Sequence, residues 1–107
     1  MEQSINYKEI PVEEIYRSVN LNENFKIKLD ISLNCNGQWI KIFDPDYLKI
    51  TGLRRVNGPQ IDSYLDKEII EFKPLKKGEI KLKLLEINYL GPYREIIYNI
   101  KIADESI

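Results

Sequence analysis

The longest run of alternating apolar and polar residues in the chain lies between Lys77 and Ile102. In its first half isoleucine and leucine alternate with lysine, and in its second half every other residue from Ile96 onward is apolar or aromatic. A period of two residues is typical of β-strands that bury one face. The pattern predicts an antiparallel hairpin closed by a loop at Leu90–Tyr93. Because two strands alone are unstable in water, the earlier strands must supply a second layer.

A similar alternation runs from Val19 to Leu33 and is interrupted by Asn22-Glu23-Asn24, which predicts a short strand, a turn and a long strand. Before it the pattern is helical, because four residues fall at the spacing i, i+3, i+4, i+7: Val12, Ile15, Tyr16 and Val19. This spacing predicts one or two turns of amphipathic helix after Pro11. Residues 1–18 are therefore expected to be either an N-terminal extension that carries this helix or a part of the β domain.

The segment Asn34–Gln38 joins the long strand to a further strand, Trp39–Phe43. Asn36-Gly37 within it is a strong signal for a two-residue type I′ hairpin turn, because both residues tolerate a positive φ. Such a turn would pair Leu33 with Ile40. The alternative is a wider loop that carries the chain from one sheet to the other. The residues of this segment leave both connections open, although local propensity alone favours the hairpin.

The middle of the chain contains several turn signals. Asp44-Pro45-Asp46 predicts a turn, and the strand that begins at Tyr47 is expected to stop at Gly52. The stretch Leu53–Lys67 has few apolar residues and contains Asn-Gly-Pro, so it predicts a long surface loop. Glu68–Lys73 then predicts another strand, with Ile70 and Phe72 on one face.

Counted together, about seven or eight short strands with turn signals between them predict an all-β immunoglobulin-like β-sandwich with Greek-key connections. The length fits a single domain over residues 1–107. The alternation predicts that the core contains Phe25, Ile27, Leu29, Ile42, Leu48, Ile50, Phe72, Leu82, Leu84, Tyr98 and Ile100.

Composition narrows the choice of partners. The chain has 16 Lys and Arg against 17 Asp and Glu, a net charge of −1, and no separate block of one sign, so no nucleic-acid partner is expected. No run of residues is long and apolar enough to span a bilayer, and no membrane partner is expected. The N-terminus lacks the apolar core of a signal peptide, so we expect a soluble protein, either cytoplasmic or in a mature secreted form.

Candidate chemistry is sparse. The chain has no histidine and a single cysteine, Cys35, which excludes Ser-His and Cys-His nucleophile systems and an intrachain disulfide. Asp44 and Asp46 fit a turn better than half of a calcium site, because Pro45 separates them and no further acid follows at loop spacing. Four other acids, Asp62, Asp66, Glu68 and Glu71, are typical of strand-edge protection rather than of glycoside hydrolysis. No enzymatic activity, metal ion or cofactor is therefore expected.

The order of the segments resembles the chagasin family of cysteine-peptidase inhibitors from about Val19 onward. Residues 25–29 are similar to the family's first long strand, and Gly37-Gln38-Trp39 resembles the end of its N-P-T-T-G-[FY]-x-W loop. Residues 44–50 and 71–89 resemble later strands, and Leu90–Tyr93 stands where the family has an R-P-W loop. The paired threonines and the glycine-rich middle loop are absent, and Gly91 replaces the arginine of R-P-W.

The resemblance implies an immunoglobulin-like sandwich that plugs the active-site cleft of papain-type cysteine peptidases with three loops. The family-like order of strands also favours the wider loop at Asn36-Gly37, which joins the two sheets, and we predict it. The residues that would contact the peptidase are Asn34, Cys35, Asn36, Gly37, Gln38, Trp39, Tyr64, Gly91, Pro92 and Tyr93. Asn34–Gln38 would enter the cleft as a wedge, flanked by Asp62–Asp66 and Gly91–Tyr93, with Tyr64 and Tyr93 as aromatic anchors.

Two alternatives remain open. Trp39 and Tyr93 could instead be core or rim residues that close one end of the sandwich. The rival function is a non-inhibitory adhesive or assembly module, of the surface or phage type, that binds through its strand edges.

Overall fold

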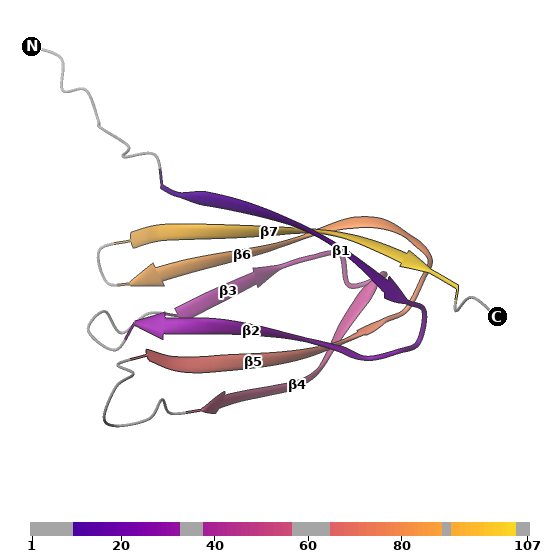
Figure 1. Ribbon diagram of the computed structural model, residues 1–107, viewed down its shortest axis with the longest axis horizontal. Helices are drawn as coiled ribbons and strands as arrows, with labels where there is room; N and C mark the ends of the chain where they lie inside the picture. The colour runs from indigo at the N-terminus through magenta and orange to yellow at the C-terminus, as the bar shows by residue number, and fades with distance from the viewer. Residues whose placement is uncertain (1–9, 33–37, 57–64, 89–90, 105–107) are drawn as a thin grey trace, which may run out of the picture.

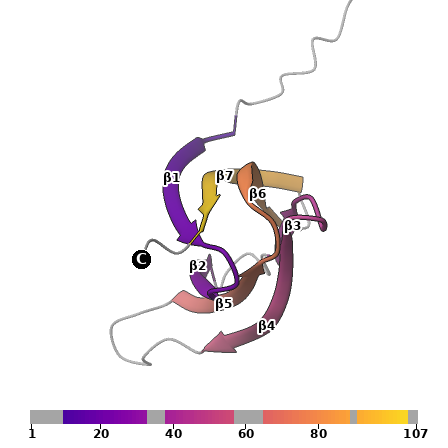
Figure 2. The same ribbon diagram turned by 90° about the vertical axis from the view of Figure 1, so that its right-hand side faces the viewer.

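A computed structural model describes residues 10–32, 38–56, 65–88 and 91–104 of the chain. They form seven β-strands: β1 Val12–Asn20, β2 Phe25–Ser32, β3 Gln38–Ile42, β4 Leu48–Val56, β5 Leu65–Pro74, β6 Gly78–Asn88 and β7 Gly91–Ala103. One sheet has the order β1-β7-β6-β3 and the other the order β2-β5-β4 (Figure 1). Seen from one end, the two sheets face each other and enclose the core (Figure 2). The predicted immunoglobulin-like sandwich is confirmed.

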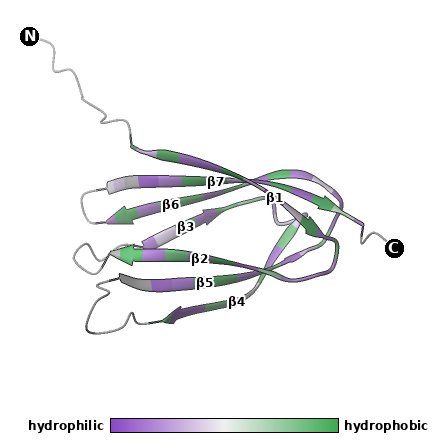
Figure 3. Ribbon diagram, in the orientation of Figure 1, coloured by the Kyte–Doolittle hydropathy of each residue, from purple (hydrophilic) through white to green (hydrophobic). Residues whose placement is uncertain are grey.

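The hairpin near the C-terminus is the longest strand pair. β6 and β7 pair antiparallel along their whole length, from Gly78 opposite Ile102 to Asn88 opposite Gly91. Hydrophobic and hydrophilic residues alternate along these strands (Figure 3), so that one face of the hairpin turns to the core. At the open end of the hairpin Gly78 has a φ of +148°, and a Cβ there would lie 2.9 Å from the Tyr47 ring. Glycine is needed at this position for both reasons.

Eight of the eleven residues predicted for the core are buried. Tyr98 is partly buried and packs against them. The predictions for Ile42 and Ile50 are wrong, because their side chains are 51% and 36% exposed. In β3, Trp39 faces inward and Ile42 faces outward. Both sets of alternating residues in β3 contain apolar side chains, so the pattern alone could not choose the buried face. Ile50 lies on β4, the terminal strand of its sheet, directly before a β-bulge at Thr51.

The predicted N-terminal helix is wrong. Val12–Asn20 forms β1, which pairs parallel with β7. In this strand Val19 is buried and Ile15 is partly buried against the core, whereas Tyr16 is 79% exposed. Valine, isoleucine and tyrosine favour strands over helices, and pairing with β7 decided the outcome.

The long surface loop predicted over Leu53–Lys67 is also wrong at both ends. β4 continues through Gly52 to Val56, with a register shift between Ile50 and Gly52, and β5 already begins at Leu65. Strands at the edge of a sheet bury few side chains, so a scarcity of apolar residues did not distinguish this strand from a loop. Residues 57–64 lie outside the described part of the chain.

The connection between β2 and β3 follows the wider alternative. The two strands belong to different sheets, and Ile40 pairs with Leu85 of β6. A hairpin between β2 and β3 is thereby excluded, and the prediction that this connection crosses between the sheets is confirmed. Within the described ranges, no helix is long and apolar enough to cross a membrane.

Leu82 and Leu84 of β6 are fully buried and provide a test of the core. Replacing either by alanine removes buried methyl groups and leaves a cavity, so each variant should lose about 2–5 kcal/mol of unfolding free energy. Chemical denaturation measures this loss. The control is Ile42→Ala on the exposed face, which should change stability much less. Equal losses in all three variants would contradict the assignment of the faces.

Tyr98 predicts how stability depends on alkaline pH. Burial raises the pKa of its phenol above the ordinary 10.0, nearby Arg17 opposes the rise, and Glu13 adds to it. A raised pKa means that the folded state holds the proton more tightly, so its contribution to stability is complete below pH 10.0 and is lost as the pH rises through the folded pKa. Tyr98→Phe should therefore lose less stability than the native chain above pH 10.0, measured by denaturation across that range.

Candidate functional site

Three interstrand connections leave the sandwich at the same end. β2, β4 and β6 end there, and β3, β5 and β7 begin there (Figure 1). The register agrees, because Ser32 lies opposite Leu65 and Asn88 lies opposite Gly91. The strands therefore bring the ends of the three predicted binding segments to one surface, which an inhibitor that uses all three requires.

The described residues include only part of the predicted site. Gln38 is exposed at the start of β3, and Gly91 and Pro92 begin β7. The backbone of Tyr93 lies in β7, and its side chain is outside the described part of the structure. The remaining predicted contact residues also lie outside it: Asn34, Cys35, Asn36, Gly37 and Tyr64.

Gly91 has a φ of +116°, and a Cβ there would meet no atom within 4 Å. Space is therefore available at this position, but the backbone conformation is one that residues with a side chain rarely adopt. An arginine at this position would therefore be strained.

Trp39 is a core residue that supports this end of the sandwich. Its side chain is 4% exposed, and its Nε1 donates a hydrogen bond to the carbonyl oxygen of Asp30 at 3.1 Å. Asp30 belongs to β2 in the opposite sheet, so the bond ties the two sheets together. The structure thus decides between the two interpretations of Trp39. The residue closes the end of the sandwich, and its ring is not available to a partner.

Trp39 is the first of three neighbouring inward side chains across β3, β6 and β7. In the register Trp39 lies opposite Glu86, and Glu86 lies opposite Arg94. Arg94 binds Glu86 Oε1 through Nε at 3.0 Å and through Nη2 at 2.8 Å. Its guanidinium carbon lies 4.9 Å from the centre of the Trp39 ring, and its Nη2 donates to the Asp30 carbonyl at 3.3 Å. We call these four residues the loop-end clamp.

The Glu86 carboxylate is the buried centre of the loop-end clamp. Its side chain is 0% exposed, and Oε2 accepts no hydrogen bond from any residue that the structure describes. A buried charge is tolerated only with a well-placed partner, because the cost of removing it from water is several kcal/mol. The need to neutralise Glu86 therefore fixes the position of Arg94. Because Arg94 lies near the start of β7, it also fixes the start of that strand.

A second ion pair joins the sheets nearby. Lys41 of β3 binds Glu68 of β5, and both side chains are 15% exposed. Sequence reasoning missed Lys41, Glu86 and Arg94 because charged residues were assigned to the outer faces. A signal was nevertheless present, since Glu86 follows Leu82 and Leu84 at the same period of two.

Three of the six acidic candidates, Asp44, Glu68 and Glu71, have structural contacts, whereas Asp62 and the side chain of Asp66 lie outside the described part of the chain. Asp44 Oδ1 accepts a hydrogen bond from the Asp46 backbone N–H at 2.9 Å, which confirms the predicted turn. Glu68 is in the ion pair just described, and Glu71 Oε1 accepts from the Thr51 hydroxyl at 3.0 Å. Among the described residues, no group of three or more acids, cysteines or histidines is arranged to hold a metal ion.

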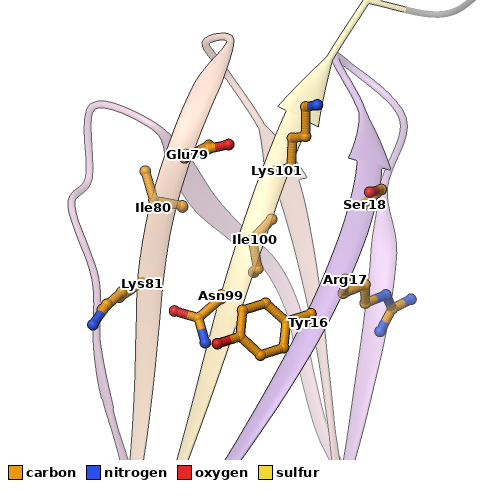
Figure 4. A pocket seen from close by; sticks show the side chains of 9 residues that line it. All are labelled: Tyr16, Arg17, Ser18, Glu79, Ile80, Lys81, Asn99, Ile100 and Lys101. Carbon is orange, nitrogen blue, oxygen red and sulfur yellow. The ribbon is translucent and has the colours of Figure 1, made fainter.

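One concavity lies away from these loops. It is an open groove of about 560 Å³ over β1, β7 and β6, near Gly78 and the C-terminal end of β7 (Figure 4). Tyr16 lies beside Asn99 on one side, and Glu79 and Lys81 line the other. The groove is open to solvent and lies toward the opposite end of the sandwich, so its residues do not add chemistry to the loop end.

The loop-end clamp predicts a large effect of removing Arg94. Arg94→Met keeps most of the apolar stem but leaves the Glu86 carboxylate buried without its partner. The variant should lose about 3 kcal/mol of unfolding free energy, near the lower end of the range for a buried pair because Arg94 is partly exposed.

Lys67→Ala is the matched control, because it breaks an exposed pair with Asp30 and should cost less than about 1 kcal/mol. Replacing both clamp charges, Glu86→Leu with Arg94→Met, should restore much of the stability, because no charge is then left buried without a partner. Denaturant titrations compare the variants. Similar losses for Arg94→Met and Lys67→Ala would contradict the role of the clamp.

No protein-family model matches the sequence, and no curated protein sequence matches it. Solved structures do share its fold. The cysteine protease inhibitor EhICP2 from Entamoeba histolytica superposes with a TM-score of 0.71 at 17% identity, over 89% of this chain and 98% of that protein. Amebosin gives a TM-score of 0.63 at 18% identity, over 87% and 99% of the two chains. PbICP-C, solved in complex with falcipain-2, gives 0.66 at 13% identity, over 88% and 91%. The chain therefore has the immunoglobulin-like fold of the chagasin-type cysteine protease inhibitors.

Proposed function

We propose that this protein inhibits papain-type cysteine peptidases by placing the loops at one end of the sandwich in the active-site cleft. The observation that carries the proposal is the convergence of the three connections at that end, above the loop-end clamp. Proteins of the same fold support it, since EhICP2 is a cysteine protease inhibitor and PbICP-C was solved in complex with falcipain-2.

Inhibition of this kind needs no chemistry from the inhibitor. Asn34–Gln38 would enter the cleft as the central wedge, with Gly91–Tyr93 on one side and Asp62–Asp66 on the other. A loop held on rigid strands loses little conformational entropy when it binds, and this raises affinity without additional contacts. Trp39, Glu86 and Arg94 would hold the strand ends in place from beneath, and Tyr93 would act as an aromatic anchor.

A second candidate is an adhesive or assembly module that binds through its strand edges. It is favoured by exposed apolar side chains on terminal strands of both sheets, notably Ile42 on β3 and Leu53 on β4, which is 57% exposed. Such a module would not inhibit a peptidase, so one assay separates the two functions.

Two substitutions test the inhibitor. Gly37→Ala adds a Cβ where close approach of the backbone is expected and should weaken inhibition without unfolding the domain. Tyr93→Ala should weaken binding by about 1–3 kcal/mol if the ring is an anchor. The measurement is titration of papain and related endopeptidases with a fluorogenic substrate, together with a thermal melt of each variant.

Tyr16→Ala is the matched control for Tyr93→Ala, because Tyr16 is an exposed tyrosine on β1, far from the loop end. It should leave inhibition unchanged. If the native chain does not inhibit any of several papain-type enzymes at micromolar concentration, the proposed function is wrong and the assembly module takes its place.

A further inference from the structure

The outer face of the sheet β2-β5-β4 is strongly cationic. The residues that alternate with the buried ones on these strands include six cations and two acids: Lys26, Lys28, Lys49, Arg54, Lys67 and Lys73 with Asp30 and Glu71. Six positive against two negative charges give this face a net charge of +4, whereas the whole chain has −1. We call it the cationic face.

The stability of the isolated domain does not account for this arrangement. Within the described part of the chain, Lys67 is the one cation of this face with an ion pair, at 3.3 Å from Asp30. Lys49 and Lys73 lie directly opposite each other on β4 and β5. Like charges in opposed positions of a sheet destabilise it. An anionic partner would relieve this repulsion.

The other sheet shows that the charge excess is local. Its outer face carries three acids and three lysines on the same alternation: Glu14, Glu79 and Glu95 with Lys81, Lys83 and Lys101. The two faces therefore differ in charge although they belong to one small domain, and the second face offers matched control positions.

The cationic face ends at the free edge of β4. β4 is the terminal strand of its sheet, so half of its backbone N–H and C=O groups point away from β5. Along this edge Lys49, Arg54 and Val56 lie on the outer row, whereas Ile50 and Leu53 lie on the inner row, remain exposed and are followed there by Arg55. The edge thus presents backbone hydrogen-bonding groups between a row that is mainly cationic and a row that is apolar at Ile50 and Leu53.

A second copy of β4 does not fit this edge. The outer row of one copy would lie beside the outer row of the other, so that the cations of the two copies would repel each other. A sulfated glycan would satisfy the cations but would leave the apolar row and the backbone groups unused. An extended peptide satisfies all three features if its acidic and apolar residues alternate, because successive side chains of a strand point to opposite faces.

We propose that β4 is a docking edge for an extended acidic segment of a partner protein, which adds to the sheet β2-β5-β4 as a fourth strand. Its acidic side chains lie over Lys49 and Arg54 on the cationic face. Its apolar side chains cover Ile50 and Leu53. This surface is the side of the sandwich, distinct from the loop end, so the proposal does not depend on inhibition of a peptidase.

The test uses the full chain and a peptide of alternating glutamate and valine, as long as the nine residues of β4. Binding is followed by calorimetry and by NMR shifts of β4 amides at low and at physiological ionic strength. The native chain should bind the peptide, and more tightly at low salt. Lys49→Glu and Arg54→Glu should each weaken binding by about tenfold or more, because they place like charges at the contact. Lys81→Glu and Lys83→Glu, on the other sheet, should leave it unchanged.

Lys49→Glu also has a second, independent readout. Its carboxylate would lie opposite Lys73 and replace a repulsion by an attraction, so the midpoint of thermal unfolding should rise while peptide binding falls. A loss of binding caused by damage to the fold would instead lower the midpoint.

Two N-methylated peptides separate strand addition from attraction of charge alone. Methyl groups on the glutamate nitrogens or on the valine nitrogens leave the charge unchanged, but one of the two sets blocks the N–H groups that would face β4. Binding lost for one peptide and kept for the other supports the proposal. Equal binding of both, together with binding of a sulfated oligosaccharide, shows a surface that recognises charge only and overturns it. If the peptide does not bind even at low salt, the proposal is also overturned. The lysines would then serve only to protect the sheet edge from aggregation.

Discussion

The carbonyl oxygen of Asp30 accepts hydrogen bonds from two side chains of the opposite sheet, and the loop end of the sandwich depends on this contact. Trp39 Nε1 donates at 3.1 Å and Arg94 Nη2 at 3.3 Å. Arg94 is held in turn by the fully buried Glu86. A buried carboxylate without its partner is costly, so the three strands that carry Trp39, Glu86 and Arg94 can close only in one arrangement.

This polar end contrasts with the rest of the core. Away from the loop end the core is apolar, and the Phe72 ring lies 5.5 Å from that of Phe25 in the same sheet and 5.6 Å from that of Phe43, which follows β3 of the other sheet. Apolar packing tolerates rearrangement, whereas a charged and hydrogen-bonded cluster fixes geometry. A loop end with fixed strand positions suits the proposed inhibition, in which the connecting segments would bind the peptidase. The cationic face lies on a different side, so two partners could be bound at once.

The sequence by itself determined the class of fold and most of its strands. In β2 the inward residues are all apolar and the outward ones all polar, so the buried face is unambiguous. In β5, β6 and β7 most apolar residues share the inward face, although Ile69, Leu85 and Ile97 point outward. Burial of Ile27, Phe72 and Leu82 followed directly. The change of sheet between β2 and β3 was predicted from the resemblance to the chagasin family, against the local preference of Asn36-Gly37 for a hairpin turn.

The tertiary structure alone decided the features that depend on distant neighbours. β1 became a strand because β7 offered it an edge, and β3 buried Trp39 rather than Ile42 although both faces are apolar. Glu86 could be buried only because Arg94, eight residues later, lies opposite it across the hairpin. The net charge of −1 did not reveal the cationic face, because the register of three strands, and not the composition, brings its lysines together. Local patterns specify which face of a strand is apolar, but pairing and burial are set by contacts between residues far apart in the chain.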